Sequence, residues 1–143
     1  MKIYLDNSVL NRPFDDQSDP KIRLETIATF FIFELIEGKK VKLVNSSVIE
    51  YENSKNPFPE RKIWISVYLS KATFYQELNL KIKERAREIS KLKIPPIDSL
   101  YLSSAEVAGV DYFLTCDYDI IRKYRGDLKV TNPIDFIQLF RPK

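Results

Sequence analysis

Carboxylates are the side chains of this sequence whose positions best suit chemistry. Four of them lie next to the ends of predicted strands or at the start of predicted helices: Asp6, Glu50, Asp98 and Asp117. Oxygen ligands select hard cations such as Mg²⁺ and Mn²⁺ over zinc or copper. Such ions generate a hydroxide nucleophile, orient a phosphodiester and stabilise the charge on the leaving oxygen. The acids therefore predict a Mg²⁺ or Mn²⁺ site that hydrolyses phosphodiesters.

The composition removes the main alternatives to carboxylate chemistry. The 143 residues include no histidine, which excludes Ser-His-Asp triads, Cys-His pairs and paired-histidine ribonuclease chemistry. Cys116 is the one cysteine, so neither an internal disulfide framework nor a zinc site of thiolates and imidazoles within one chain is possible. We expect Cys116 to be a small buried residue without a nucleophilic role.

Short apolar segments alternate with segments of helical periodicity, which predicts a parallel sheet covered by helices on both faces. The predicted strands are Lys2–Leu5, Val41–Val44, Thr73–Glu77, Tyr112–Thr115 and Lys129–Thr131. The predicted helices run from Pro20 to Gly38, from Ser47 onward, over Glu60–Leu69, Leu80–Leu92 and Asp98–Ala108, shortly after Asp119, and over Pro133–Phe140. Residues 7–17 are expected to be mostly loop, with room for one turn of helix. There is no linker or repeat, so we expect one domain over residues 1–143.

This order of elements places the acids near one another. In an open parallel sheet, sites form outside the carboxyl ends of the strands. Asp6 and Asp117 each follow a predicted strand, and Glu50 lies in the first turn of the helix after another strand. Asp98 begins the helix that leads into Tyr112–Thr115 and joins the other acids if its loop folds over them.

Each acid also has a structural interpretation. Asp98 is a good N-cap after Pro95-Pro96, Glu50 completes an S-x-x-E capping box with Ser47, and Asp117 can cap the helix that follows it. Asp6 ends a strand and is expected to have no helix to cap. Four independent caps have no reason to meet at one edge of a sheet, so their joint placement favours a site.

Three segments resemble the PIN-domain nucleases, a family that includes the VapC-type toxins of toxin–antitoxin pairs. They are "IYLDNSVLNRPF", "VNSSVIEYE" and "PPIDSLYLSSAEVAGVDYFLTCDYDI", and with their order the resemblance runs over essentially the whole chain. The third segment is the most specific and the second is weak alone. The resemblance implies a three-layer α/β fold and an acidic site of Asp6, Glu50, Asp98 and Asp117.

The resemblance also implies that Ser8 and Thr115 orient the first and last acids through their hydroxyls. Asp119 is an alternative to Asp117 as the fourth acid, and Glu52 is expected to point to a different side of its helix from Glu50. The expected activity is Mg²⁺- or Mn²⁺-dependent cleavage of single-stranded or structured RNA, as the toxin of a pair held inactive by a small antitoxin. The alternative is a catalytically degenerate PIN domain that binds RNA or another protein.

The remaining features concern partners and location. The net charge is +3, the charged start Met1–Asp6 does not suit a signal peptide, and no apolar run is long enough to span a membrane. We therefore expect a cytoplasmic protein with no membrane contact. The predicted helix Pro20–Gly38 is apolar on more than one side, which predicts burial by the rest of the fold or by a second copy in a homodimer.

Overall fold

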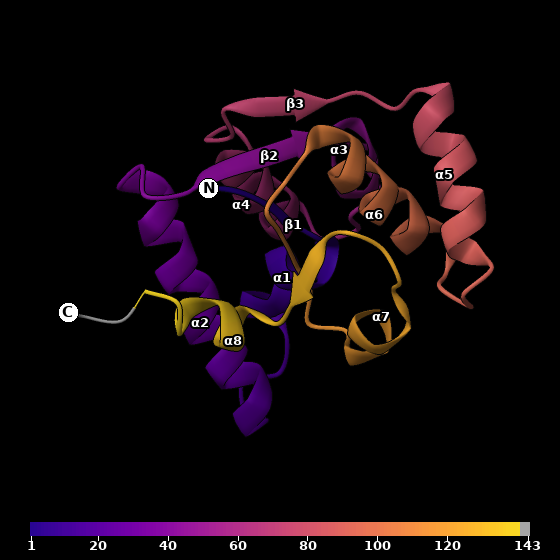
Figure 1. The fold of residues 1–143 in the computed structure, drawn as a ribbon. Coiled ribbons are helices and arrows are strands. Elements are labelled where there is room, and N and C mark those ends of the chain that lie inside the picture. Colours follow the sequence, from indigo (N-terminus) through magenta and orange to yellow (C-terminus); the bar gives the residue numbers. More distant parts are fainter. Residues whose placement is uncertain (141–143) are drawn as a thin grey trace.

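A computed structural model describes residues 1–140 and contains a five-stranded sheet in which all strands are parallel (Figure 1). The strand order is β3-β2-β1-β4-β5. The strands are β1 (Lys2–Leu5), β2 (Lys42–Ser46), β3 (Phe74–Gln76), β4 (Tyr112–Leu114) and β5 (Lys129–Thr131). Each agrees with a predicted strand to within about two residues at its ends, so the predicted parallel α/β architecture is confirmed.

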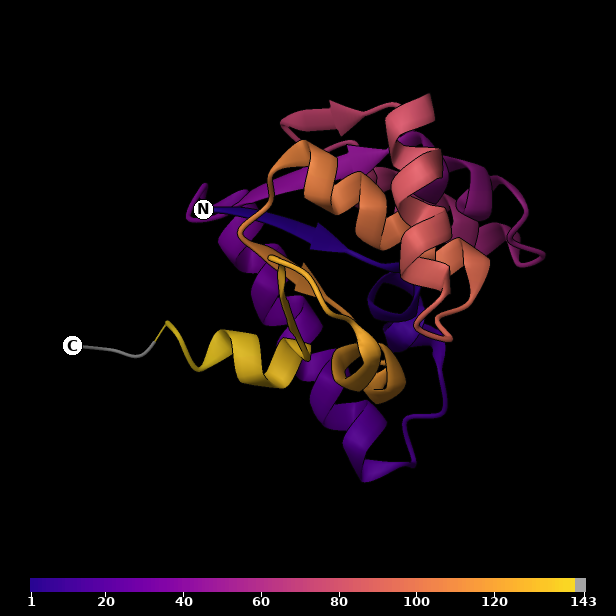
Figure 2. The same cartoon turned by 45° about the vertical axis from the view of Figure 1, so that its right-hand side comes forward.

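Helices connect the strands and lie on both faces of the sheet (Figures 1 and 2). They are α1 (Asn7–Asn11), the 3-10 helix η1 (Arg12–Phe14), α2 (Pro20–Glu37), α3 (Ser47–Ser54), α4 (Pro59–Leu69), α5 (Leu80–Ser90), α6 (Pro96–Ala108), α7 (Tyr118–Lys123) and α8 (Pro133–Ile137). Right-handed crossovers place α2 and α4 on one face, because the chain moves outward from β1 to β3. The return to β4 and β5 places α5, α6 and α7 on the other face.

The core lies between the sheet and these two helical layers. The central strand β1 is buried along its apolar run, and the ring of Tyr4 stacks on Phe113 of the neighbouring β4 with centroids 5.4 Å apart. On one face, Phe33 of α2 stacks on Tyr68 of α4 at 3.9 Å. The stacked rings of Tyr4 and Phe113 thus pack β1 and β4 against each other. Within residues 1–140, no helix is both long and apolar enough to cross a membrane.

Two expectations about local structure are wrong. Residues 7–14 form α1 and η1 rather than mostly loop, because the Asp6 side chain caps α1. The helix after the double proline begins at Pro96, two residues earlier than predicted, because the fixed φ of proline suits the first helical position.

The apolar surface of α2 is only partly covered by the rest of the chain. Phe33 and Ile36 are buried, whereas Leu24, Ile27 and Phe30 are all more than 40% exposed. The rest of the described chain therefore buries one side of α2 and leaves a second apolar side exposed.

Gly109 ends α6 in the left-handed region, with a φ of 70°. No other group lies within 4 Å of the position that a Cβ would occupy, so backbone conformation alone sets the cost of a side chain there. We expect Gly109→Ala to lower the free energy of unfolding by about 1 kcal/mol. Denaturant titration of the two proteins measures this difference, and identical midpoints with identical slopes would contradict it.

Candidate active site

The carboxyl ends of β1 and β4 meet where the order of the strands reverses. The chain leaves β1 toward β2 and β3, then returns to β4 on the other side of β1. Ligand sites of open α/β sheets lie at such a switch point. The amide of Asp6 donates to the carbonyl of Leu114 at 3.2 Å, and the amide of Cys116 donates to Ser8 Oγ at 3.0 Å. The segments that carry Asp6 and Asp117 are therefore adjacent.

Asp6 is the innermost acid of this edge, with only 2% of its surface exposed. Its Oδ1 accepts hydrogen bonds from Ser8 Oγ at 2.5 Å and from the amide of Val9 at 3.2 Å. The expectation that Asp6 has no helix to cap is thus wrong. Burial raises the pKa of Asp6 to about 6, although the hydrogen bonds from Ser8 and Thr115 favour the charged form. A carboxylate held here costs free energy unless a positive charge compensates it.

The hydroxyls of Ser8 and Thr115 lie between the first and last acids, where the orienting role expected of them requires them to be. Ser8 Oγ donates to Asp6 and lies 3.4 Å from Thr115 Oγ1. Thr115 Oγ1 accepts from the amide of Asp117 at 3.1 Å. Both hydroxyls therefore contact the backbone and side chains around Asp6 and Asp117.

Asp98 comes to the same edge from the first turn of α6. Pro95 is the N-cap of α6, and no side chain makes a capping hydrogen bond there, so the interpretation of Asp98 as an N-cap is wrong. The pKa of Asp98 is raised to about 6 by burial and by the negative charges of Asp6, Asp117 and Glu52. Asp98 thus lies within electrostatic range of three other carboxylates.

Of the two acids of α3, Glu52 and not Glu50 is the one whose charge acts on Asp98. Ser46 caps α3 by accepting from the amide of Ile49 at 3.2 Å, so the capping box of Ser47 and Glu50 does not form. Glu50 accepts a hydrogen bond from Asn45 Nδ2 at 2.6 Å. Glu50 acts electrostatically on Tyr75 of β3, whereas Glu52 acts on Asp98. The two acids do point to different sides of α3, as predicted.

Asp117 is better placed than Asp119 to be the fourth acid. Asp117 caps α7 by accepting from the amide of Asp119 at 2.9 Å, and its charge raises the pKa of Asp98. The carboxylate of Asp119 instead forms an exposed ion pair with Arg122, one helical turn away. Capping and participation in the acidic group are compatible for Asp117, because only its Oδ1 accepts the capping bond.

The donor chemistry of this group suits a hard divalent cation, because the side chains offer only oxygen and each carboxylate disfavours the charge of the next. In the conformation described for residues 1–140, no three acidic or cysteine side chains converge closely enough to ligate one ion. The acids are thus close enough to interact electrostatically without forming a finished coordination shell.

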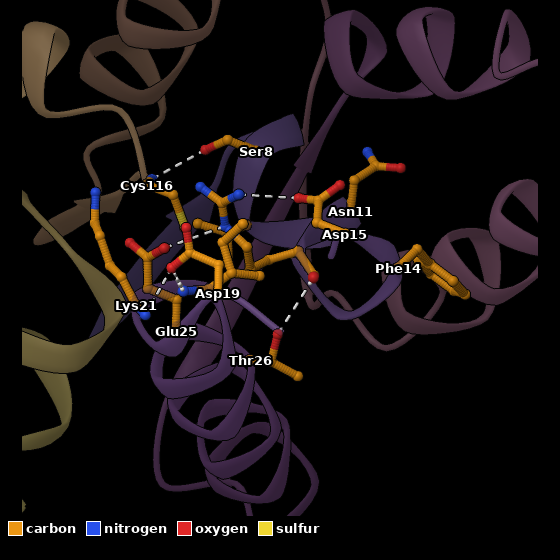
Figure 3. Close-up of polar contacts among 12 residues, drawn as sticks. Ser8, Asn11, Phe14, Asp15, Asp19, Lys21, Glu25, Thr26 and Cys116 are labelled. Carbon is orange, nitrogen blue, oxygen red and sulfur yellow. Dashed lines mark hydrogen bonds and ion pairs between the residues drawn. The ribbon is translucent and has the colours of Figure 1, made fainter. Parts of the chain in front are cut away.

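A buried network of opposite charges supports the site from α2. Glu25 is fully buried, and Arg12 Nε lies 3.2 Å from its Oε1 (Figure 3). Asn132 Nδ2 donates to Glu25 Oε2 at 2.5 Å, and Arg12 Nη1 pairs with Asp15 at 3.0 Å. Sequence reasoning missed this network. Its signal was the acid Glu25 on the buried side of an apolar helix, which requires a cation from elsewhere in the fold.

Arg12 and Lys21 also line a recess of about 420 Å³ that borders Ser8, Cys116 and Asp117. Arg12 is already paired with Glu25 and Asp15, whereas Lys21 forms no ion pair within residues 1–140 and is the cation left to a bound polyanion beside this end of the acidic group. Cys116 itself is buried, and burial raises the pKa of its thiol to about 12. This confirms the prediction of burial, and a protonated thiol is not a nucleophile.

The fold of this chain matches those of solved structures. One of them is a chain of VapBC2 from Rickettsia felis, determined in complex with a DNA fragment from its promoter. The two chains share 18% sequence identity with a TM-score of 0.64, over 92% of this chain and 98% of the other. Neither a protein-family model nor a curated protein sequence matches this chain. The likeness in structure therefore identifies the fold of this chain as the PIN fold.

Proposed function

We propose that this protein is a divalent-metal-dependent endoribonuclease. The observation that carries the proposal is that carboxylates from four parts of the chain gather at the switch point of the sheet. The pKa of Asp98 is raised there by the charges of Asp6, Asp117 and Glu52. Structural acids have no reason to be collected from distant parts of the chain at a free-energy cost. The likeness in fold to a chain of VapBC2 supports the same conclusion.

In this proposal, Asp6, Asp98 and Asp117 hold one or two Mg²⁺ or Mn²⁺ ions, and Glu52 completes the acidic group. The bound metal supplies an activated water and stabilises charge on the leaving oxygen. Ser8 and Thr115 keep Asp6 and the Asp117 segment in place through their hydroxyls. Lys21 attracts the phosphate backbone to the side of the site next to Asp117.

The direct test is cleavage of end-labelled single-stranded RNA by purified protein. We expect cleavage in Mn²⁺ or Mg²⁺ and none in excess chelator. Asp6→Asn is the matched variant, since its side-chain oxygen still accepts from Ser8 and Val9 while its charge is gone. Metal-independent cleavage would reject the proposal. Inert wild-type protein that still binds RNA would favour the degenerate RNA-binding domain instead.

Substitutions of the two acids of α3 are expected to have different effects on kcat. We expect Glu52→Gln to lower kcat at least about tenfold, because Glu52 belongs to the acidic group around Asp98. Glu50→Gln should leave kcat within about twofold, since an amide can still bond to Asn45. Single-turnover RNA cleavage by both variants measures the difference. The reverse order of effects would restore Glu50 as the metal-site acid.

We further propose that the protein is the toxin of a toxin–antitoxin pair and forms homodimers. The first part rests on the VapBC2 likeness, which suggests a small antitoxin as partner. The second part rests on α2, whose apolar side chains Leu24, Ile27, Phe30 and Phe31 remain exposed. Sedimentation at micromolar concentration should give a dimer, and a monomer at every concentration would contradict the second part.

A further inference from the structure

A recess of about 350 Å³ adjoins the acidic group on the side of Glu52. Its lining includes Asn11, Glu52, Lys55, Asn56, Phe58 and Arg61. These residues come from α1, from α3 and the segment after it, and from α4. We call this recess the α3–α4 groove. The lining also includes Asn7, which directly follows Asp6, so the groove lies beside the candidate active site.

The cations of the α3–α4 groove are held by aromatic rings rather than neutralised by carboxylates. Lys55 Nζ lies 4.2 Å from the ring centroid of Tyr51, and the Arg61 guanidinium lies 4.6 Å from that of Phe58. Arg61 Nη2 also donates to the carbonyl of Phe14 at 2.9 Å. Within residues 1–140, neither cation forms an ion pair. Both charges remain available to an anionic ligand.

Phe58 gives the groove an exposed aromatic surface. The side chain is 54% exposed although it is large and apolar, and it lies directly before α4, where it makes no capping hydrogen bond. An exposed aromatic ring next to cations is the combination with which proteins bind single-stranded nucleic acid. The ring stacks on a base and the cations contact the backbone phosphates.

Side-chain amides also line the α3–α4 groove. Asn11 Nδ2 donates to the carbonyl and to the Oδ1 of Asn7, and Asn56 Nδ2 lies 3.4 Å from Asn11 Oδ1. Asn56 Oδ1 accepts from the amide of Phe58 at 3.1 Å, which orients the segment that carries the ring. Amides are suited to the donor and acceptor edges of unpaired bases.

We propose that the α3–α4 groove binds a nucleotide of single-stranded RNA next to the phosphodiester that is cut. Phe58 stacks on its base, and Lys55 and Arg61 contact the neighbouring phosphates. The identity of the ligand as substrate rests on the proposed nuclease function, but the binding itself requires no metal. The two aromatic–cation pairs and the free charges favour RNA over an acidic peptide of a partner protein, which would need no exposed stacking surface.

The test measures binding in the absence of catalysis. Fluorescence anisotropy of a labelled single-stranded RNA oligonucleotide is recorded in excess chelator at several salt concentrations. We expect Phe58→Ala to bind about tenfold more weakly with an unchanged salt dependence, as loss of one stacked base predicts. Lys55→Gln should bind more weakly and show a shallower salt dependence, by about 0.7 in the logarithmic slope.

Phe74 and Lys42 provide matched controls. Phe74 is an exposed phenylalanine at the start of β3, with Lys2 Nζ 4.0 Å and Lys42 Nζ 5.9 Å from its ring centroid. These residues lie away from the carboxyl edge of the sheet, where the acids gather. We expect Phe74→Ala and Lys42→Gln to bind RNA as the wild type does.

The outcomes separate this inference from the nuclease proposal. If the wild type, Phe58→Ala and Lys55→Gln bind RNA equally well and the wild type cleaves normally, the proposed RNA binding by the groove is overturned. The nuclease proposal then still stands. Selective loss of binding in the two variants, with no cleavage under any metal, supports the groove and rejects the nuclease. Binding of an acidic peptide but not RNA, sensitive to Lys55→Gln alone, assigns the groove to a protein partner and overturns the inference.

Discussion

Replacing Asp98 by asparagine is expected to abolish RNA cleavage while making the metal-free protein more stable. The charges of Asp6, Asp117 and Glu52 all raise the pKa of Asp98. Replacing Asp98 therefore removes a ligand from the centre of the proposed metal site. We expect kcat to fall at least about 100-fold, as for a group that stabilises charge in the transition state. The substituted side chain has no capping bond to preserve, because Asp98 makes none. Loss of cleavage in this variant therefore reports on the site and not on the helix start.

The gain in stability follows from the raised pKa of Asp98. A rise from 3.8 to about 6 corresponds to about 3 kcal/mol at neutral pH, and solvent screening of a partly exposed carboxyl reduces this to about 1 kcal/mol. The folded state binds the proton more tightly than the unfolded state, so the wild type loses stability as pH rises from about 4 to about 6. The advantage of Asp98→Asn should appear over this window and stay constant above it.

Thermal unfolding of both proteins in chelator, at acidic and at neutral pH, measures this difference. Asp111→Asn is a suitable comparison, because Asp111 is an exposed acid whose side chain accepts from the amide of Lys2. Saturating Mn²⁺ should then stabilise the wild type and not Asp98→Asn, since a ligand stabilises only the protein that binds it. A variant that keeps wild-type activity, or that is less stable at neutral pH in chelator, would contradict the proposed site.

Replacing Arg12 by methionine is expected to produce the largest loss of stability. Methionine keeps much of the length of the side chain but leaves the fully buried carboxylate of Glu25 without its cation. Asn132 alone then contacts Glu25. Breaking a buried ion pair in this way costs about 3 kcal/mol or more, which corresponds to a decrease in Tm of roughly 10 °C.

A second substitution distinguishes the charge from the packing of Arg12. Arg12→Met combined with Glu25→Gln should recover most of the lost stability, because the amide is neutral and can still bond to Asn132. Arg122→Met is the control, since it breaks only the exposed pair with Asp119 and should cost less than about 0.5 kcal/mol. If the double variant is as unstable as Arg12→Met alone, loss of packing rather than the uncompensated charge is the cause.

The strands and the longer helices of this protein, and the edge at which Asp6 and Asp117 lie, were predictable from the sequence, whereas the short helices α1 and η1 were not. The five strands were predictable because short apolar runs alternate with helical periodicity, and this pattern is local. The convergence of Asp6 and Asp117 was also predictable, since parallel strands place their carboxyl ends together. Gly109 at the end of α6 followed from the same local rules, because glycine adopts a φ of 70° there without strain.

Long-range packing, by contrast, determines which acid of α3 acts on Asp98 and which cation compensates the buried charge of Glu25. Glu50 and Glu52 are both acids of α3, and the register of the helix is set by Ser46, which caps α3 and contacts the hydroxyl of Tyr4 at 2.7 Å. That contact joins residues 42 positions apart. The pairing of Arg12 with Glu25 and Asn132 likewise joins η1, α2 and the start of α8. Such choices depend on long-range packing and not on local propensity, so an acid on the buried side of a helix, such as Glu25, indicates that a cation is needed but not which one.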